Sequence, residues 1–319
     1  MRHARIKLDG EGFYHVMSRI VRRKFWIDDE EKMLLLEGIR RAAAFCGVEI
    51  YTYAIMDNHF HLLVRVPAKR DVDDTELRHR MAALYGPERT DAQFAIWAIW
   101  ARSGRADRVE AEKARLKARM FDLSQFCKTF KERYTQAYNR RHDNAGAGTI
   151  WGSRFQSVLL EGSDGALMSV AAYIHTNPIR AGIVDVPENS PWTGFGAACQ
   201  GDATARAGLV ALAKRLFGTN SWEHARNACL NAIEGRIGSP SATLHARQTS
   251  TPPATPAPMR PLLQKRCPSF SRGGALGTSA FLEQIRPLLP PRIHHWRTPQ
   301  PAAFLALGLN SSLGVRETA

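Results

Sequence analysis

Two histidines two residues apart are the side chains of this sequence with the clearest chemical potential. His59 and His61 stand in an alternating run, residues 58–66, which reads NHFHLLVRV. Residues two apart in a strand point to the same side, so both imidazoles would share one face at the edge of a sheet, while Phe60 and the apolar residues after it face a core. Neutral imidazole is the commonest protein ligand for a divalent ion. The pair predicts either part of a metal site or two ordinary half-exposed histidines, because two ligands alone do not define a site.

A tyrosine and an asparagine four residues apart form the second candidate group. Residues 165–177 predict a helix that Pro178 stops, because proline disfavours helical geometry in the residue before it. Tyr173 and Asn177 lie on one side of this helix, at the flank of its apolar stripe. They would therefore sit at the border between core and solvent, where a site can form. The alternative is a packed tyrosine with a surface hydroxyl and an ordinary helix-end asparagine.

The elements that must position these groups alternate between strand and helix. Strands are expected at 13–20, 49–56, 59–66 and 154–160, and Asp57-Asn58 makes the turn before the histidines. A helix is expected at 29–47, opened by acidic residues that suit the positive end of its dipole. A long basic helix or helix pair is expected at 110–141. The pattern predicts an α+β fold.

Composition shifts divide the chain into four parts. We expect a catalytic domain at 1–186, with a charged and poorly patterned insertion at 68–107 that contains one or two short helices. A helical extension is expected at 187–238. Residues 239–269, rich in Pro, Thr, Ser and Ala, cannot build a core and predict a disordered linker. Residues 270–319 predict a short helical unit and a basic tail.

Charge and cysteine usage limit the classes of function. The 319 residues carry a formal net charge of +14 and 44% hydrophobic residues, with a pI of about 10.0. A polyanionic partner is indicated, and nucleic acid is the commonest one; a basic protein without such a partner is the alternative. The five cysteines are scattered without CxxC spacing, as expected for a reduced, cytoplasmic protein. No apolar run reaches the ~18 residues that a membrane span needs, and no apolar segment follows the basic first residues, so we expect neither a membrane span nor a signal peptide.

Basic residues near the predicted strands and on the long helix are candidates for phosphate contacts. The triplet at 22–24 predicts either a solvated loop or such a contact. On the helix, the cations would contact phosphates while Tyr134 and Tyr138 pack inside. The predicted DNA-binding residues are Arg22, Arg23, Lys24, Lys131, Arg133, Arg140, Arg141 and Arg154.

Three motifs together carry a resemblance to a known family. They are NHFHLL at 58–63, WGSRFQS at 151–157 and YIHTNPIRAGIV at 173–184. In this order, and on these elements, they resemble the REP-associated tyrosine transposases, of the His-hydrophobic-His superfamily of single-strand DNA nucleases. The resemblance covers roughly residues 4–201, and weakly 271–285. The insertion at 68–107 has no counterpart in the family pattern, and the role of His175 is open because many members carry another polar residue there.

The resemblance implies a fold, a cofactor and roles for the site residues. The fold would be ferredoxin-like, with a central antiparallel sheet, helices on one face and a helical C-terminal extension. His59 and His61 would bind Mg²⁺ or Mn²⁺, Asn177 would be a third metal-site group, and Tyr173 would be the nucleophile. The partner would be single-stranded or hairpin DNA, and the protein a monomer or homodimer.

The chemistry of such a site is coherent. A divalent ion on the non-bridging oxygens removes the repulsion between a phosphodiester and its attacker. A phenol with a pKa of about 10 can attack phosphorus and leave again with a similar barrier. The covalent 5′-phosphotyrosine therefore stores the bond energy needed for strand transfer. Tyr134 and Tyr138 are rival nucleophiles, although neither is followed four residues later by an amide or acid.

Three functions are consistent with these features. The first is a transposase that acts as a metal-dependent single-strand DNA endonuclease and strand transferase. The second is a hairpin DNA-binding protein that does not cut and does not need Tyr173. The third is a metal-dependent hydrolase of a small substrate, which the charge and the lack of a further ligand cluster disfavour.

The basic charge generates a prediction about salt. Affinity for a single-stranded oligonucleotide should fall linearly on a log–log plot against salt concentration, with a slope of about −0.7 for each phosphate contacted. The reason is that Lys and Arg side chains that bind phosphates release the counterions condensed on the DNA. Fluorescence anisotropy at several salt concentrations measures the slope. A flat response would remove the case for nucleic acid and favour the small-substrate hydrolase.

Overall fold

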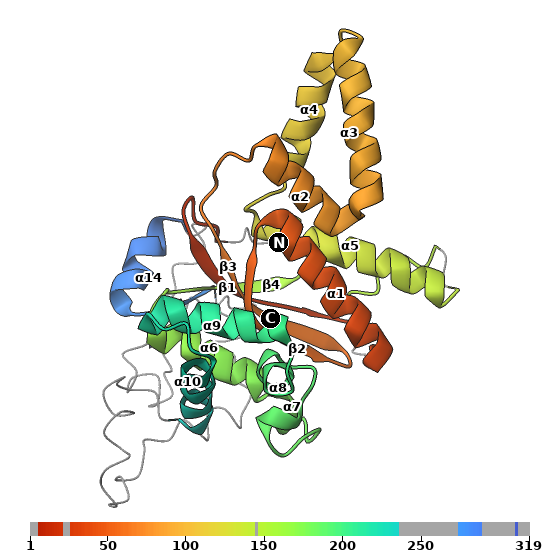
Figure 1. Cartoon of the computed structure of the whole chain (residues 1–319). Helices are drawn as coiled ribbons and strands as arrows, with labels where there is room; N and C mark the ends of the chain where they lie inside the picture. The colour runs from red at the N-terminus through yellow and green to blue at the C-terminus, as the bar shows by residue number, and fades with distance from the viewer. Residues whose placement is uncertain (1–5, 22–25, 144–145, 236–273, 289–309, 312–319) are drawn as a thin grey trace, which may run out of the picture.

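The structure is a computed structural model, and it confirms an α+β fold built on one sheet (Figure 1). It describes residues 6–21, 26–143, 146–235, 274–288 and 310–311. The strands are β1 (Gly12–Arg19), β2 (Glu49–Met56), β3 (His59–Val66), β4 (Gln156–Leu160), β5 (Ala275–Gly277) and β6 (Asn310–Ser311). The longer helices are α1 (Asp29–Cys46), α2 (Asp74–Tyr85), α3 (Pro87–Arg102), α4 (Ala106–Lys117), α5 (Leu123–Arg141), α6 (Asp164–His175), α9 (Ala203–Phe217) and α10 (Trp222–Glu234). The shorter ones are α7 (Asn177–Arg180), α8 (Gly194–Cys199) and α14 (Ser279–Ile285), with 3₁₀ turns at Pro187–Asn189 and Arg286–Leu288.

The strands pair in the order β2-β3-β1-β4-β5-β6. The first four are antiparallel, as expected for a ferredoxin-like unit, whereas β5 is parallel to β4. β3 lies between β2 and β1, so the histidine strand is internal and not at an edge as the sequence suggested. In the β1–β3 register, Met17 lies opposite His61 and Arg19 lies opposite His59. This register determines which side chains surround the histidines.

Helices cover both faces of the sheet rather than one. α1 and α5 pack together on the face that receives Phe60, whose ring lies 5.5 Å from that of Phe130 on α5. The opposite face is covered by α6, and α8 and α9 pack on β2 (Figure 1). The expected arrangement therefore describes the ferredoxin-like unit alone. The extra layer has a consequence for the site, because it buries the face that carries the histidines.

Local signals explain why α1 and the β2–β3 hairpin form where they do. Asp28 caps α1 by accepting from the Glu31 backbone at 2.9 Å, and Gly47 ends the helix with a positive φ of 67°. The hairpin turn is tied back to the fold, because the Asp57 carboxylate lies 2.7 Å from the Lys32 ammonium. The Asn58 carbonyl accepts from the Ile20 backbone at 2.8 Å. The start of β3 is thus held from two sides.

The predicted insertion at 68–107 contains α2, α3 and the first residues of α4. These helices project away from the sheet as an arm (Figure 1). Ile96 and Ile99 of α3 are largely exposed, while Trp97 is buried. The buried side chains of the arm, Trp97 among them, continue the main core through α2, which packs on α1, and lie away from the histidine face.

The expected helical extension, 187–238, packs directly on the sheet. α9 approaches β2 so closely that a Cβ atom at Gly208 would lie 2.6 Å from the Ile50 carbonyl oxygen. The predicted linker, 239–269, lies outside the described residues. The segment expected as a short helical unit also supplies a strand, β5, followed by α14. None of the described helices is long and apolar enough to span a membrane.

The C-terminal segment completes the core, which yields a prediction about stability. Leu276 of β5 is fully buried, and Glu161 accepts from the Thr278 backbone at 2.7 Å. Leu276→Ala should lower the free energy of unfolding by about 2–5 kcal/mol, as buried leucine truncations do. Leu288→Ala, at a side chain that is 49% exposed, is the matched control and should change it by less than about 0.5 kcal/mol. Equal chemical denaturation curves for the two variants would contradict the placement of β5 in the core.

Candidate nuclease site

His61 is the centre of the site, and it is buried between the sheet and α6. Its side chain is 1% exposed. Its ring stacks on His15 of β1 at 5.1 Å between centroids and meets the Tyr173 ring of α6 edge to face at 5.8 Å. The Nδ1 atom lies 2.9 Å from His15 Nε2, whereas the Nε2 atom has no hydrogen-bond partner within the described part of the chain. Burial of an unsatisfied imidazole nitrogen is costly, and His61 Nε2 shares this property with His175 Nδ1. The position of His61 beside His59 and Tyr173 makes its Nε2 atom the candidate ligand atom.

The electrostatics keep this imidazole neutral. Burial lowers the pKa of His61 well below 6.5, and the neighbouring His59, His15, Arg180 and Arg19 lower it further. Neutral imidazole is the form that binds metal. If the Nδ1–H of His61 donates to His15, the lone pair lies on the unsatisfied Nε2, which is the arrangement that a metal ligand with an outer hydrogen-bond partner requires.

His59 stands beside His61 with a similar arrangement. Its ring lies 5.0 Å from that of His61, and its Nδ1 atom lies 2.6 Å from the Asn58 side-chain oxygen. An amide oxygen can only accept, so His59 donates from Nδ1 and, when neutral, carries its lone pair on Nε2. His59 is half-buried at the end of the sheet, next to Arg19. The two histidines together fit a divalent ion.

A third ligand for such an ion would have to come from a residue other than an acid or a further histidine of the described part of the chain. Among the described residues, no cluster of three or more His, Cys, Asp or Glu side chains could hold an ion. The predicted third group, Asn177, is 8% exposed and lies at the start of α7, two residues beyond the end of α6. Its amide nitrogen donates to the Tyr173 carbonyl at 2.9 Å, so only its oxygen is available to an ion.

Tyr173 lies where a nucleophile for this site would be needed. Its ring contacts both His15, at 5.9 Å, and His61. The side chain is 3% exposed, so it lies deeper than the helix flank that the sequence predicted. The Arg180 guanidinium lies 4.2 Å above its ring and donates to its backbone carbonyl at 3.3 Å. A cation at this position suits a phenol that must face a phosphate.

The structure brings in two residues that the motifs did not assign to the site, His15 and Arg180. His15 is fully buried and touches both His61 and Tyr173. The alternation of the first strand placed it on one face, but only the β1–β3 register shows that this is the histidine face. Arg180 was within the motif at 173–184, and its cationic side chain was the available signal.

His175, whose role was open, points to the opposite side from Tyr173. Its Nε2 atom lies 2.7 Å from the Thr52 hydroxyl of β2, and its ring packs 5.4 Å from that of Phe195. Complete burial lowers the pKa of His175 to about 3. This histidine ties α6 to β2, and so holds Tyr173 against the site without touching it.

Those predicted phosphate contacts that the structure describes lie away from the histidines. Arg22, Arg23 and Lys24 are outside the described residues. The four cations on α5 lie on the face opposite His61. Arg154 is exposed in the loop before β4 and borders a groove of about 860 Å³ along α5.

Of the four α5 cations, one is buried and another forms an ion pair with a buried carboxylate. Lys131 is 9% exposed and donates to the Ser18 hydroxyl at 2.7 Å, which argues against the predicted phosphate contact. Arg141 forms an ion pair with Glu31 at 2.6 Å. Arg133 is exposed and donates to the Leu84 carbonyl at 3.3 Å, and Arg140 is exposed.

The rival tyrosines have structural positions. Tyr134 is 4% exposed and donates its hydroxyl to Glu31 at 2.8 Å. Burial, and then this acceptor, raise the pKa of Tyr134 far above its usual value of 10, and burial also raises the pKa of Tyr138. A phenol that holds its proton so firmly is a poor nucleophile. This geometry favours packing for both, on the face of the sheet away from the histidines.

Comparison with known families now bears on these residues. Residues 11–103 match the model of a family described as transposase IS200 like. The chain resembles the IS200-like transposases. The match includes His59 and His61, whereas Tyr173 and Asn177 lie beyond it. It confirms the resemblance indicated by the motifs and supports a transposase role. A solved structure described as "Structure of the REP associates tyrosine transposase bound to a REP hairpin" is 15% identical, covers 62% of this chain and 84% of its own, and superposes with a TM-score of 0.40. No curated protein matches the chain.

The buried His175 gives a pH-dependent prediction. Its pKa is about 3 in the folded protein and about 6.5 when unfolded, so the unfolded state binds more protons between these values. Stability is therefore present above pH 6.5 and is lost as the pH falls towards 3, by up to about 1.4 kcal/mol per pH unit for this one group. His175→Gln should flatten the pH dependence of the melting temperature. His224→Gln, at an exposed histidine of α10, should keep the wild-type slope; equal slopes in all three proteins would contradict the assignment.

Proposed function

We propose that this chain is a metal-dependent single-strand DNA endonuclease and strand transferase that acts on hairpin-forming DNA through a 5′-phosphotyrosine on Tyr173. The observation that carries the proposal is the contact of the Tyr173 ring with His61, whose buried Nε2 atom has no partner in the described chain. The proposed nucleophile, Tyr173, and an imidazole nitrogen that could bind a metal ion, His61 Nε2, are therefore buried next to each other. The transposase match supports the reaction class.

Different residues of the site would bind the metal ion, orient its ligands and contact the phosphate. His59 and His61, with the Asn177 oxygen as the third group, would hold Mg²⁺ or Mn²⁺, which neutralises the phosphate and stabilises its charge in the transition state. His15 orients His61 through the 2.9 Å contact at Nδ1. Arg19 and Arg180, the two cations that act on His61, would face the phosphate from β1 and α7.

The covalent step exchanges one ester for another. The Tyr173 oxygen forms a bond to phosphorus and loses its proton, and the bond from phosphorus to the 3′ oxygen breaks as that oxygen gains a proton. The 5′ phosphate stays on the enzyme. A free 3′ hydroxyl can reverse the step on the same or another strand, so transfer needs no external energy source. One tyrosine cuts one strand at a time, which fits unpaired DNA.

A hairpin-binding protein that does not cut is the second candidate. The observation that favours it is the separation of the exposed cations of α5 and Arg154 from Tyr173, because a surface on the other face of the sheet could bind DNA without the histidine site. This function would share the salt dependence but form no covalent adduct.

The nucleophile can be tested directly. Tyr173→Phe removes only the hydroxyl, so it should abolish the covalent adduct with a hairpin oligonucleotide and Mg²⁺ while leaving the melting temperature and DNA affinity nearly unchanged. Tyr134→Phe, which keeps the ring but loses the bond to Glu31, should still form the adduct. Denaturing gels and mass spectrometry of the modified peptide measure this.

Two further variants separate the metal from the nucleophile. His61→Ala should lose Mn²⁺ binding in calorimetry and cleavage together, but keep DNA affinity, which comes from cations elsewhere. An adduct on Tyr134 or Tyr138 would overturn the assignment of Tyr173. Cleavage without any adduct would show that water is the nucleophile, and binding without cleavage would favour the second candidate.

A further inference from the structure

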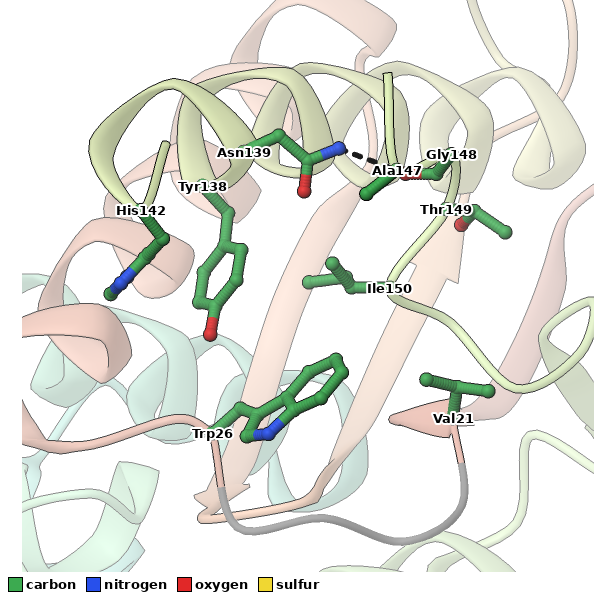
Figure 2. Close-up of a pocket in the computed structure, with 9 residues that line it drawn as sticks. All are labelled: Val21, Trp26, Tyr138, Asn139, His142, Ala147, Gly148, Thr149 and Ile150. Atoms are coloured by element: carbon green, nitrogen blue, oxygen red, sulfur yellow. Dashed lines mark hydrogen bonds between the residues drawn. The ribbon is translucent and has the colours of Figure 1, made fainter. Parts of the chain in front are cut away.

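A pocket of about 430 Å³ at the end of α5 is walled by aromatic rings (Figure 2). The rings of Trp26 and Tyr138 are nearly parallel, with an interplanar angle of 21° and 6.3 Å between their centroids. The centroid of the His142 ring lies 4.1 Å from that of Tyr138. Val21 and Ile150 form the apolar remainder of the wall. A pocket of this size, bounded by flat rings, is suited to a flat aromatic ligand.

One polar group gives the pocket a preference among flat ligands. The amide nitrogen of Asn139 donates to the Gly148 carbonyl at 2.9 Å, which fixes the orientation of the side chain. Its oxygen is thereby turned towards the pocket (Figure 2). An acceptor beside aromatic rings suits a ligand whose edge carries N–H groups, as nucleobases do.

The surroundings of the pocket are basic. Among the described residues, its lining contains no Asp, Glu, Lys or Arg. His142 lies 3.0 Å from Glu31, a carboxylate that Arg141 already neutralises. The adjoining groove along α5 shares Asn139 and two loop residues with the pocket. The charged residues of the groove are Lys128, Lys131 and Arg154 against one acid, Glu132.

The pocket and the histidines lie at the same end of the sheet. Val21, in the pocket wall, donates its backbone N–H to Ile150 at 2.8 Å, just beyond the end of β1. Two residues earlier on the same chain, Arg19 lies opposite His59. Two strand residues span about 6–7 Å, so a DNA strand that passes over this end could reach both faces.

We propose that this pocket binds one unpaired nucleobase of the DNA substrate, stacked against Trp26 and Tyr138, while the neighbouring phosphates follow the groove past Lys128 and Arg154. The inference rests on the proposed function, because it takes single-stranded DNA as the ligand. Stacking on aromatic rings tolerates every base, and Asn139 adds an acceptor for its edge.

The test combines abasic DNA with pocket variants. A single-stranded 12-mer is prepared intact and with one abasic site at each position in turn, and its affinity for the full-length wild-type protein is measured by anisotropy without metal, so that no cleavage occurs. Loss of the stacked base should weaken binding by about 5- to 150-fold at one position. Trp26→Leu should weaken the intact 12-mer similarly, and removal of that base should then cost the variant little more, because the two changes delete one contact.

Controls separate this stacking contact from charge and from misfolding. Trp100→Leu, at a half-buried tryptophan of the arm, should behave as wild type in the scan. Arg154→Gln should reduce the salt slope by about 0.7 but keep the same sensitive position, whereas Trp26→Leu should keep the slope. If Trp26→Leu fails to melt cooperatively, stacking is tested in the wild-type protein instead. A 2-aminopurine base placed at the sensitive position of the 12-mer should lose fluorescence on binding, because stacking quenches it.

The outcomes distinguish failure of the pocket proposal from failure of the proposed function. Steep, salt-dependent binding with no sensitive position, or with additive losses in Trp26→Leu, overturns the pocket and leaves the proposed function standing. A wild-type protein that does not bind single strands overturns both. A sensitive position with non-additive losses supports the pocket, whether or not Tyr173 forms an adduct.

Discussion

The structure depends on one constraint, which is that β3 must be buried on both faces while carrying imidazoles on one of them. Phe60 enters the apolar layer under α5, and His61 enters the layer under α6. A shift of one residue in the strand register would exchange these side chains and put an imidazole into the apolar core. The unsatisfied Nε2 of His61 costs about 1–3 kcal/mol unless a ligand meets it. The site therefore lowers the stability of the protein locally, and the packing of the rest of the fold offsets this cost.

Several contacts hold β3 and α6 in the required register. The hairpin turn is bound by Lys32 and by the backbone of Ile20, and the far side of α6 is bound to β2 through His175 and Thr52. These groups lie outside the site, yet each limits a movement that would separate Tyr173 from His61. Buried polar contacts of this kind are costly when incomplete and fix geometry when complete. His175 is satisfied on one side of its ring only: its Nε2 atom contacts Thr52, whereas its Nδ1 atom has no hydrogen-bond partner within the described residues.

Short-range signals in the sequence were enough for the strands β1 to β4 and for the paired histidines. Alternation gave β2 and the face of Phe60, and acidic residues at the start of α1 gave its first turn. Long-range pairing was not available from local pattern. His15 could be placed on a face, but its contact with His61 depends on the register between β1 and β3, two strands separated by a helix and another strand. Likewise, Leu276 reads as part of a helical unit, and only its pairing with Leu160 makes it a strand residue.

Under the proposed function, the two faces of the sheet would offer different chemistry to one DNA strand. The face under α6 has a buried, low-dielectric site with a phenol and the neutral imidazole of His61, where a reacting phosphate would lose most of its water. The face under α5 has exposed cations beside an aromatic pocket whose described lining has no Asp, Glu, Lys or Arg, and there a strand would be held by counterion release and stacking while remaining hydrated. β1 ends at Arg19 beside His59, and Val21 in the pocket wall follows two residues later, so binding and cutting would be separated by the thickness of the sheet yet joined through the end of one strand. Affinity could then come from contacts that do not change during the reaction, and the buried site would be left to act on the transition state alone.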